Sequence, residues 1–312
     1  MIIAAAGARF KELSLEKCLD LFAESGVEGV EIAVGGFQGA PHVDPDALVS
    51  DDWAVKKLVD AAGERDISIV AVSCHGNPLH PDPDIRETHR ADFEKAVKIA
   101  VKLETPAVVC LSGCPGTDPD AKHAAWFSSA WPMEAREIIK WQWEREAIPY
   151  WKEAASFATD RGIHIAVEMH PSNLVYNPAT LLLMRNECGD AIGANVDPSH
   201  LFWQGVDPAA AVKKLDGVVY HVHAKDTVID YGAMATEGCL DAATVFEEVG
   251  RTWKFAVPGD GHHEGVWRRF ISALKDAGYD GPLSIEHEAR GVESAEGLRR
   301  AVVFLKMIMT GL

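Results

Sequence analysis

IHIAVEMHP at residues 163–171 and IGANVDPSH at residues 192–200 are the two stretches that decide the fold of this chain. Each begins as an apolar run typical of a buried β-strand. Each then ends in side chains that can bind a metal ion, Glu168 and His170 in the first and Asp197 and His200 in the second. A carboxylate at the end of a buried strand has to be paired, hydrogen-bonded or bound to a ligand. The two stretches therefore predict strands that end at a functional site.

Two later stretches repeat the arrangement. VVYHVHAKD at residues 218–226 supplies His221, His223 and Asp226, and PLSIEHEA at residues 282–289 supplies Glu286 and Glu288. Four successive strands thus deliver acidic and imidazole side chains at one end, and the rest of the chain is expected to be their scaffold.

Strands and helices alternate along the whole chain. The first helix is typical, because Ser14 is placed to cap its start and Gly26 to end it. Strands are expected at residues 1–6, 26–35, 67–76, 106–113, 164–170, 192–197, 218–226 and 282–289. Helices are expected at residues 14–26, 52–66, 84–103, 133–161, 179–187, 208–215, 265–277 and 294–309, with loops at 36–52 and 227–261.

The strands are short and almost continuously apolar, as parallel strands covered on both faces are. Strict alternation predicts an α/β protein with one (β/α)8 TIM barrel domain over residues 1–312. An open doubly wound sheet is the alternative, but it predicts a Gly-rich phosphate loop after the first strand, and AAAGARF is not such a loop.

Composition bounds the function classes. The 312 residues are 47% hydrophobic and 25% charged, with a net charge of −17, which argues against nucleic acid or an anionic membrane as a partner. No apolar run is long enough to span a membrane. The six cysteines follow no disulfide or zinc spacing, which favours reduced thiols in a cytoplasmic enzyme.

The strand ends predict a metal centre. In a barrel of this kind the working residues lie at the carboxyl ends of the strands. If Glu168, Asp197, His223 and Glu286 all point inward, three carboxylates and one imidazole meet at one point. Crowded carboxylates resist ionising unless a cation compensates them. This ligand set predicts one divalent ion per chain, Mn²⁺ first, with Mg²⁺, Co²⁺ and Zn²⁺ as alternatives.

Four motifs, EMHP at 168–171, NVDPSH at 195–200, HVHAKD at 221–226 and GYDGPLSIEHE at 278–288, resemble the xylose-isomerase-like TIM barrel family of sugar phosphate isomerases and epimerases. The resemblance implies that Glu168, Asp197, His223 and Glu286 are metal ligands and that His200 contacts substrate. One departure concerns the ketose 3-epimerases, which have a Glu and later an Arg after the seventh-strand histidine. Here Ala224, Lys225, Asp226 and Thr227 follow instead.

The chemistry that this resemblance implies is proton abstraction next to a sugar carbonyl, through an enediolate. Glu168, Glu286 and His170 are the candidate bases. Return of the proton gives an isomerase or epimerase, which is the leading hypothesis. Loss of a β-substituent gives a lyase or dehydratase on a keto-sugar or 3-keto-glycoside, like the C-glycoside deglycosidases with their small second subunit. A non-catalytic sugar-binding barrel is the alternative from another class.

The remaining candidates are expected to bind substrate, a small sugar or sugar derivative. They lie at strand ends and in neighbouring loops: His75, Asn77, Trp126, Trp131, His200, Lys225, Asp226 and His262. Phosphorylated substrates are not expected, because the strand ends carry few basic residues and no Gly-rich cradle. A homo-oligomer is compatible with the sequence.

Overall fold

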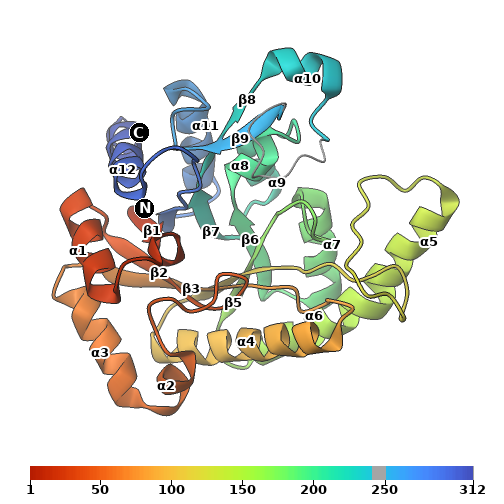
Figure 1. The fold of residues 1–312 in the computed structure, drawn as a ribbon, viewed down its shortest axis with the longest axis horizontal. Helices are drawn as coiled ribbons and strands as arrows, with labels where there is room; N and C mark the ends of the chain where they lie inside the picture. Colours follow the sequence, from red (N-terminus) through yellow and green to blue (C-terminus); the bar gives the residue numbers. More distant parts are fainter. Residues whose placement is uncertain (241–250, 312) are drawn as a thin grey trace.

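Short runs of Val, Ile and Ala form the parallel strands of a closed barrel (Figure 1). The computed structural model describes residues 1–240 and 251–311. Within these ranges eight strands close the barrel in the order β1-β10-β7-β6-β5-β4-β3-β2. Their bounds are β1 (Ile2–Ala6), β2 (Gly29–Gly36), β3 (Ser68–His75), β4 (Ala107–Leu111), β5 (His164–Glu168), β6 (Ile192–Val196), β7 (Val219–Ala224) and β10 (Pro282–Ile285). The predicted single (β/α)8 barrel is confirmed.

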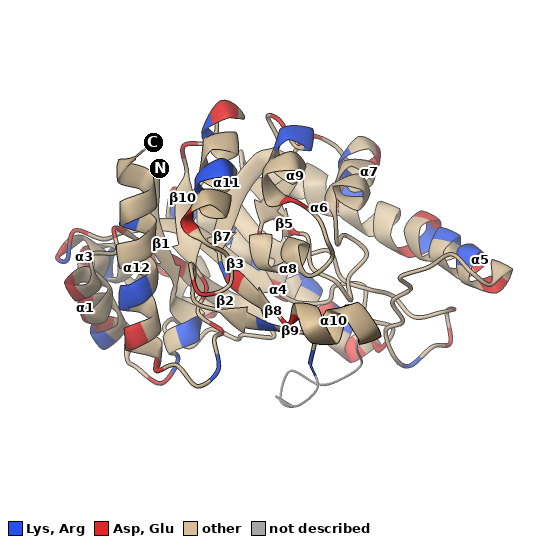
Figure 2. Ribbon diagram, turned by 90° about the horizontal axis from the view of Figure 1, so that it is seen from above, with Lys and Arg blue, Asp and Glu red and all other residues tan. Residues whose placement is uncertain are grey.

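Helices surround the barrel, and acidic and basic residues are spread along many of them (Figure 2). Ser14 caps α1 as predicted, and Gly26 ends it in the left-handed conformation. The helices are α1 (Leu15–Ser25), α2 (Pro45–Ser50), α3 (Asp52–Gly63), α4 (Pro83–Lys102), α5 (Met133–Trp141), α6 (Ile148–Thr159), α7 (Pro178–Cys188), α8 (Pro198–Phe202), α9 (Pro208–Lys214), α10 (Tyr231–Glu237), α11 (Glu264–Asp276) and α12 (Ser294–Thr310). None of those described is long and apolar enough to cross a membrane.

The predicted helix at residues 133–161 is divided. A π-helical turn, Gln142–Ala147, separates α5 from α6, and α5 extends away from the barrel together with the loop before it (Figure 1). The side chain of Gln142 is buried and donates to the carbonyl oxygens of Gly116 at 3.0 Å and Ala125 at 2.7 Å. The turn thus fixes the long loop that follows β4.

The expectation of an irregular segment at residues 227–261 was wrong in part. Two short strands, β8 (Asp226–Ile229) and β9 (Trp253–Ala256), pair antiparallel, and α10 follows β8. Each strand has four residues, too few to show a periodic pattern, and the partners are far apart in sequence. Residues 241–250 of the segment lie outside the described residues. The β8–β9 ribbon continues from β7 and stands at the carboxyl end of the barrel.

Packing divides the barrel interior into an apolar and a polar layer. Small side chains, Ala71, Ala107, Val109 and Ala166, form an apolar cluster of their own. Farther along β5, on the same face as Ala166, lies the buried carboxylate of Glu168. Side chains of a barrel pack in such layers. The ionisable residues therefore lie together at the carboxyl end, where the loops begin.

Asp226 joins the ribbon to the outer helices. Its Oδ2 accepts hydrogen bonds from the backbone N–H groups of Gly259 at 2.9 Å and His262 at 3.0 Å, and from the indole of Trp267 in α11 at 3.2 Å. Its Oδ1 accepts from the backbone N–H of Thr227 at 2.8 Å. One buried carboxylate therefore holds β8, the loop after β9 and α11 together.

We expect Asp226→Asn to lower the free energy of unfolding by about 3 kcal/mol, because an amide group replaces an oxygen that accepts from several buried donors. Urea denaturation followed by circular dichroism measures this. Asp44→Asn is the matched control, since Asp44 caps α2 and Asn caps equally well. Equal midpoints for both variants would contradict the structural role of Asp226.

Candidate metal centre

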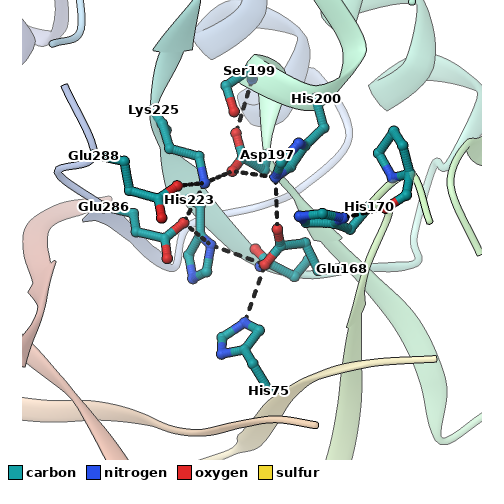
Figure 3. Close-up of polar contacts among 12 residues, drawn as sticks. His75, Glu168, His170, Asp197, Ser199, His200, His223, Lys225, Glu286 and Glu288 are labelled. Carbon is teal, nitrogen blue, oxygen red and sulfur yellow. Dashed lines mark hydrogen bonds and ion pairs between the residues drawn. The ribbon is translucent and has the colours of Figure 1, made fainter. Parts of the chain in front are cut away.

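Four side chains from successive strands of the barrel meet at one point, as the sequence predicts (Figure 3). Glu168 ends β5, Asp197 follows β6, His223 lies in β7 and Glu286 follows β10. One potential ligand atom from each lies within 4.8 Å of those of the others, and all four residues are buried. Their role as metal ligands stays a prediction.

His223 presents its two ring nitrogens to different partners. Nδ1 lies 3.3 Å from Glu168 Oε2 and 3.5 Å from Glu286 Oε2. Nε2 lies on the other side, 3.2 Å from Oε2 of Glu31. With Nε2 donating to Glu31, Nδ1 is the nitrogen directed at the cluster. A carboxylate behind a histidine in this way fixes the tautomer and orientation of a metal-binding imidazole.

Glu31 is itself held in place. The same Oε2 accepts from the hydroxyl of Ser284 at 2.9 Å and lies 2.9 Å from Nε2 of His221. Burial raises the pKa of Glu31, but the facing rings of His223 and His221 outweigh burial and hold that pKa well below its usual range. Glu31 is therefore a carboxylate that accepts from the histidines of β7.

Glu168 is surrounded by donors. Its Oε2 lies 3.1 Å from Nε2 of His75 and accepts from the amide of Asn195 at 3.2 Å, and its Oε1 lies 3.1 Å from Nε2 of His200. Burial raises the pKa of Glu168, but the nearby imidazoles of His200, His223 and His75 outweigh burial and keep that pKa well below the usual range. The side chain is ionised and firmly oriented.

Two cationic side chains reach the cluster. The ammonium of Lys225 lies 2.6 Å from Glu286 Oε2, 3.0 Å from Asp197 Oδ2 and 2.9 Å from Glu288 Oε2 (Figure 3). Arg9 donates from Nε to Glu286 Oε1 at 3.0 Å and also pairs with Glu288. Burial raises the pKa of Glu286, but Arg9 and Lys225 outweigh burial and hold it well below normal.

The donor set fits a divalent ion. Asp197 Oδ2, His200 Nε2 and His223 Nδ1 are buried and have no hydrogen-bond partner within the described ranges. Buried polar atoms without a hydrogen bond are costly, and a shared cation would satisfy these three together. Charge balance agrees, because Arg9 and Lys225 face more acidic groups than they can neutralise. The acidic side chains of the cluster are Glu31, Glu168, Asp197, Glu286 and Glu288.

Several other predicted residues also lie at this centre. His75, His200 and Lys225 contact its carboxylates directly. His170 lies beside them, with its ring centroid 4.0 Å from that of His200 and its Nδ1 against the carbonyl oxygen of Pro171. Burial lowers the pKa of His170 to about 4. Its ring is therefore neutral at pH 7.

The structure places a second group of predicted residues elsewhere. Asn77 links two loops, since its amide donates to the carbonyl oxygen of Cys114 at 2.8 Å. His262 stacks on Phe202 and pairs with Asp226. Of the two tryptophans of the loop after β4, Trp126 packs against the ring of Tyr176 and Trp131 is largely exposed.

Two charged residues that contact the cluster were missed in the sequence. Glu31 is a single acid inside the apolar run of the second strand, and the argument that identified Glu168 would have identified it too. Arg9 follows the first strand directly, at the end where functional residues collect. Its pairing with Glu286 depends on β1 lying beside β10, which only barrel closure provides.

Comparison with known proteins finds sequence similarity over nearly the whole chain. A family model described as xylose isomerase-like TIM barrel matches residues 19–308. The uncharacterized protein YfiH of Bacillus subtilis (strain 168) is 35% identical over 301 residues, which cover 96% of each chain.

Solved structures share the fold at low sequence identity. The probable 3-DHS dehydratase AsbF from Bacillus anthracis has a TM-score of 0.69 at 16% identity, covering 98% of this chain and 99% of its own. The IolI protein with a bound zinc atom has a TM-score of 0.68 at 17% identity, covering 100% and 99%. Sugar 3-epimerases are also among the similar structures.

We expect Glu31→Gln to weaken Mn²⁺ binding by about 10- to 100-fold, because the amide no longer holds the imidazole of His223 as a carboxylate does. Isothermal titration of metal-free protein with MnCl₂ measures this. Glu24→Gln, on the exposed side of α1, is the control and should bind as the wild type does. Unchanged affinity in Glu31→Gln would show that Glu31 serves only to fill the barrel.

We expect Lys225→Met to lower the free energy of unfolding of the metal-free protein by about 3–5 kcal/mol, because buried carboxylates lose a paired charge. Added Mn²⁺ should restore more stability to this variant than to the wild type. Thermal denaturation with EDTA and with MnCl₂ gives both values. Lys56→Met removes an exposed pair with Asp60 and should change stability by less than about 1 kcal/mol. If Mn²⁺ stabilised Lys225→Met and the wild type equally, the ammonium and the ion would not neutralise the same carboxylates.

Proposed function

The chain belongs to the xylose isomerase-like TIM barrel family, and on that premise we propose that it is a divalent-metal-dependent isomerase or epimerase acting on a small sugar or sugar derivative. The observation that carries the proposal is the convergence of Glu168, Asp197, His223 and Glu286 within 4.8 Å, with His223 backed by Glu31. The similar structures include sugar 3-epimerases and a probable dehydratase, which supports enzymatic activity on such substrates.

Mn²⁺ is the first choice for the ion, because three of the four donors are carboxylates, while Mg²⁺ and Co²⁺ are alternatives and the zinc bound by IolI supports Zn²⁺. When bound, such an ion polarises a substrate carbonyl and so acidifies the neighbouring C–H group. The chain's own part is then to orient the substrate and to remove that proton.

His170 is the base that the geometry favours. With Nδ1 donating to the carbonyl oxygen of Pro171, Nε2 carries the lone pair, and the neutral ring can accept a proton at pH 7. The ring lies at the edge of the cluster, next to Glu168 and His200. It can therefore reach a substrate that the other side chains hold.

Glu168 and Glu286 are poorer bases in this arrangement. Both have pKa values held well below the usual range, Glu286 by Arg9 and Lys225 and Glu168 by the surrounding histidines. A carboxylate with a depressed pKa has little tendency to take a proton from carbon. We therefore give these residues the part of ligands and of groups that position the substrate.

A dehydratase or other lyase is the second candidate, and two observations favour it. The fold resembles that of AsbF, and the rings of His170 and His200 lie 4.0 Å apart. Two adjacent imidazoles can divide the work of elimination, one removing the α-proton and the other protonating the departing β-hydroxyl. The first proton abstraction is the same in both candidate reactions.

We expect wild-type protein to bind about one divalent ion per chain and Asp197→Asn to bind none, because a buried ligand oxygen is lost. Elemental analysis by inductively coupled plasma mass spectrometry measures this after reconstitution. Asp190→Asn, with its exposed side chain, is the control. A wild type without stoichiometric metal would sink the proposed function.

We expect His170→Gln to keep the metal but to exchange substrate protons at least 100-fold more slowly than wild type, because the base is lost. Deuterium uptake from D₂O into a panel of ketoses, followed by NMR, measures exchange, and the ultraviolet absorbance of an enone detects elimination. Exchange at the wild-type rate in His170→Gln would transfer the role of base to Glu168 or Glu286.

A further inference from the structure

A cavity of about 900 Å³ opens beside the metal centre. Its walls come from loops at the carboxyl ends of the strands. Three of these walls follow strands of the barrel. After β1 come Ala8, Arg9 and Lys11, after β2 come Phe37 and Gln38, and after β10 come His287, Glu288 and Arg290. The fourth wall is the β8–β9 ribbon, with residues Val228, Asp230, Arg251, Trp253, Lys254 and Phe255.

The cavity borders the cluster of predicted ligands, because residues that line it also contact the cluster. Arg9 and Glu288 line it and also pair with each other and with Glu286 or Lys225. Phe255 of the ribbon lines it as well, edge to face with His200 at 5.4 Å and 4.7 Å from the ammonium of Lys225. A substrate held at the cluster therefore has room to extend into this cavity.

The charge of the lining opposes that of the whole protein. Five basic side chains line the cavity against two acidic ones, Asp230 and Glu288, although the chain carries a net charge of −17. Glu288 is already paired with Arg9 and Lys225. The basic side chains are Arg9, Lys11, Arg251, Lys254 and Arg290. Such a concentration of positive charge in a concave site attracts anions.

Arg251 is prepared for a ligand. Its guanidinium lies over the ring of Trp253 at 4.4 Å, which restricts the orientation of the guanidinium. Its Nε is buried without a hydrogen-bond partner in the described part of the chain. Neither Lys11 nor Lys254 has an ion pair with a described carboxylate. A planar guanidinium with a free N–H recognises carboxylate and phosphate oxygens.

We infer that the substrate is an anionic sugar derivative, with its carbonyl end at the metal centre and an oxyanion, carboxylate or phosphate, bound in the cavity by Arg251 and Lys254. The position of the carbonyl end rests on the proposed function. The basic lining of the cavity also changes the expectation from the sequence that phosphorylated substrates do not fit. Basic residues are few at the strand ends, but the loops and the ribbon supply them. The faces of Trp253 and Phe255 are available to the C–H surface of the sugar.

The inference is tested by calorimetric binding of four probes: D-gluconate, D-glucose 6-phosphate, inorganic phosphate and neutral sorbitol. We expect at least one oxyanion probe to bind at least about tenfold more tightly than sorbitol, because charge-assisted hydrogen bonds add to the contacts of the sugar. Its affinity should fall as NaCl is raised. A preference for gluconate identifies a sugar acid, and a preference for the phosphates identifies a sugar phosphate.

The double variant Arg251→Gln with Lys254→Gln should lose about tenfold or more of this affinity, a larger loss than it shows for sorbitol. Lys56→Gln with Lys57→Gln on α3 is the control, because it removes the same charge far from the cavity. Oxyanion binding no tighter than that of sorbitol, or equal in the two double variants, would overturn the inference.

Each titration is repeated with EDTA, which separates this inference from the proposed function. The basic wall does not depend on a metal, so oxyanion binding without metal uptake would leave the oxyanion site standing and remove the proposed function together with the place given to the carbonyl end. Metal uptake without any preference for oxyanions would do the reverse.

Discussion

The structure depends on the compensation of carboxylates that are buried inside the barrel. Glu31, Glu168, Asp197 and Glu286 are almost fully inaccessible to water, where a bare charge is very unfavourable. The surrounding residues compensate these charges. Histidines face Glu31 and Glu168, and the cationic side chains of Arg9 and Lys225 pair with Glu286. What remains is a group of ligand atoms without hydrogen-bond partners, among them His223 Nδ1 and Asp197 Oδ2. The same constraint that makes the centre costly to build makes it ready to bind a cation.

Lys225 gives the centre two ways of reaching charge balance. Its ammonium lies among Asp197, Glu286 and Glu288, where it neutralises part of the acidic cluster without any ion. A metal ion at the four converging ligands would take over part of this work and leave Lys225 to Glu288, the outermost and least buried of the three acids. From there the ammonium faces the cavity that Phe255 and Arg9 line, where a substrate would lie.

Much of the fold and the convergence of the four acidic and imidazole side chains could be predicted from the sequence, for one physical reason. Buried parallel strands are apolar, so an acid or imidazole at the end of one stands out, and the barrel brings all such ends together. Glu168, Asp197, His223 and Glu286 are placed as expected on this basis. Arg9 could not be paired in advance with Glu286, because nothing local links residues 277 positions apart. The strands β8 and β9 were too short to show a periodic pattern. The basic residues of the cavity come from segments far apart in the sequence, so no single motif reveals them.

The pairing of β1 with β10 has a consequence for how the protein is made. Arg9 reaches Glu286 only when the first and last strands lie side by side, and all four converging ligands come from the second half of the chain. A ribosome has to release almost the entire polypeptide before the acidic cluster is complete. Until then the nascent barrel exposes unpaired acids and an open strand edge, the kind of state on which chaperones act. Stable uptake of metal would therefore mark the end of folding and not its beginning, and a cell could use metal loading as a test that the barrel has closed.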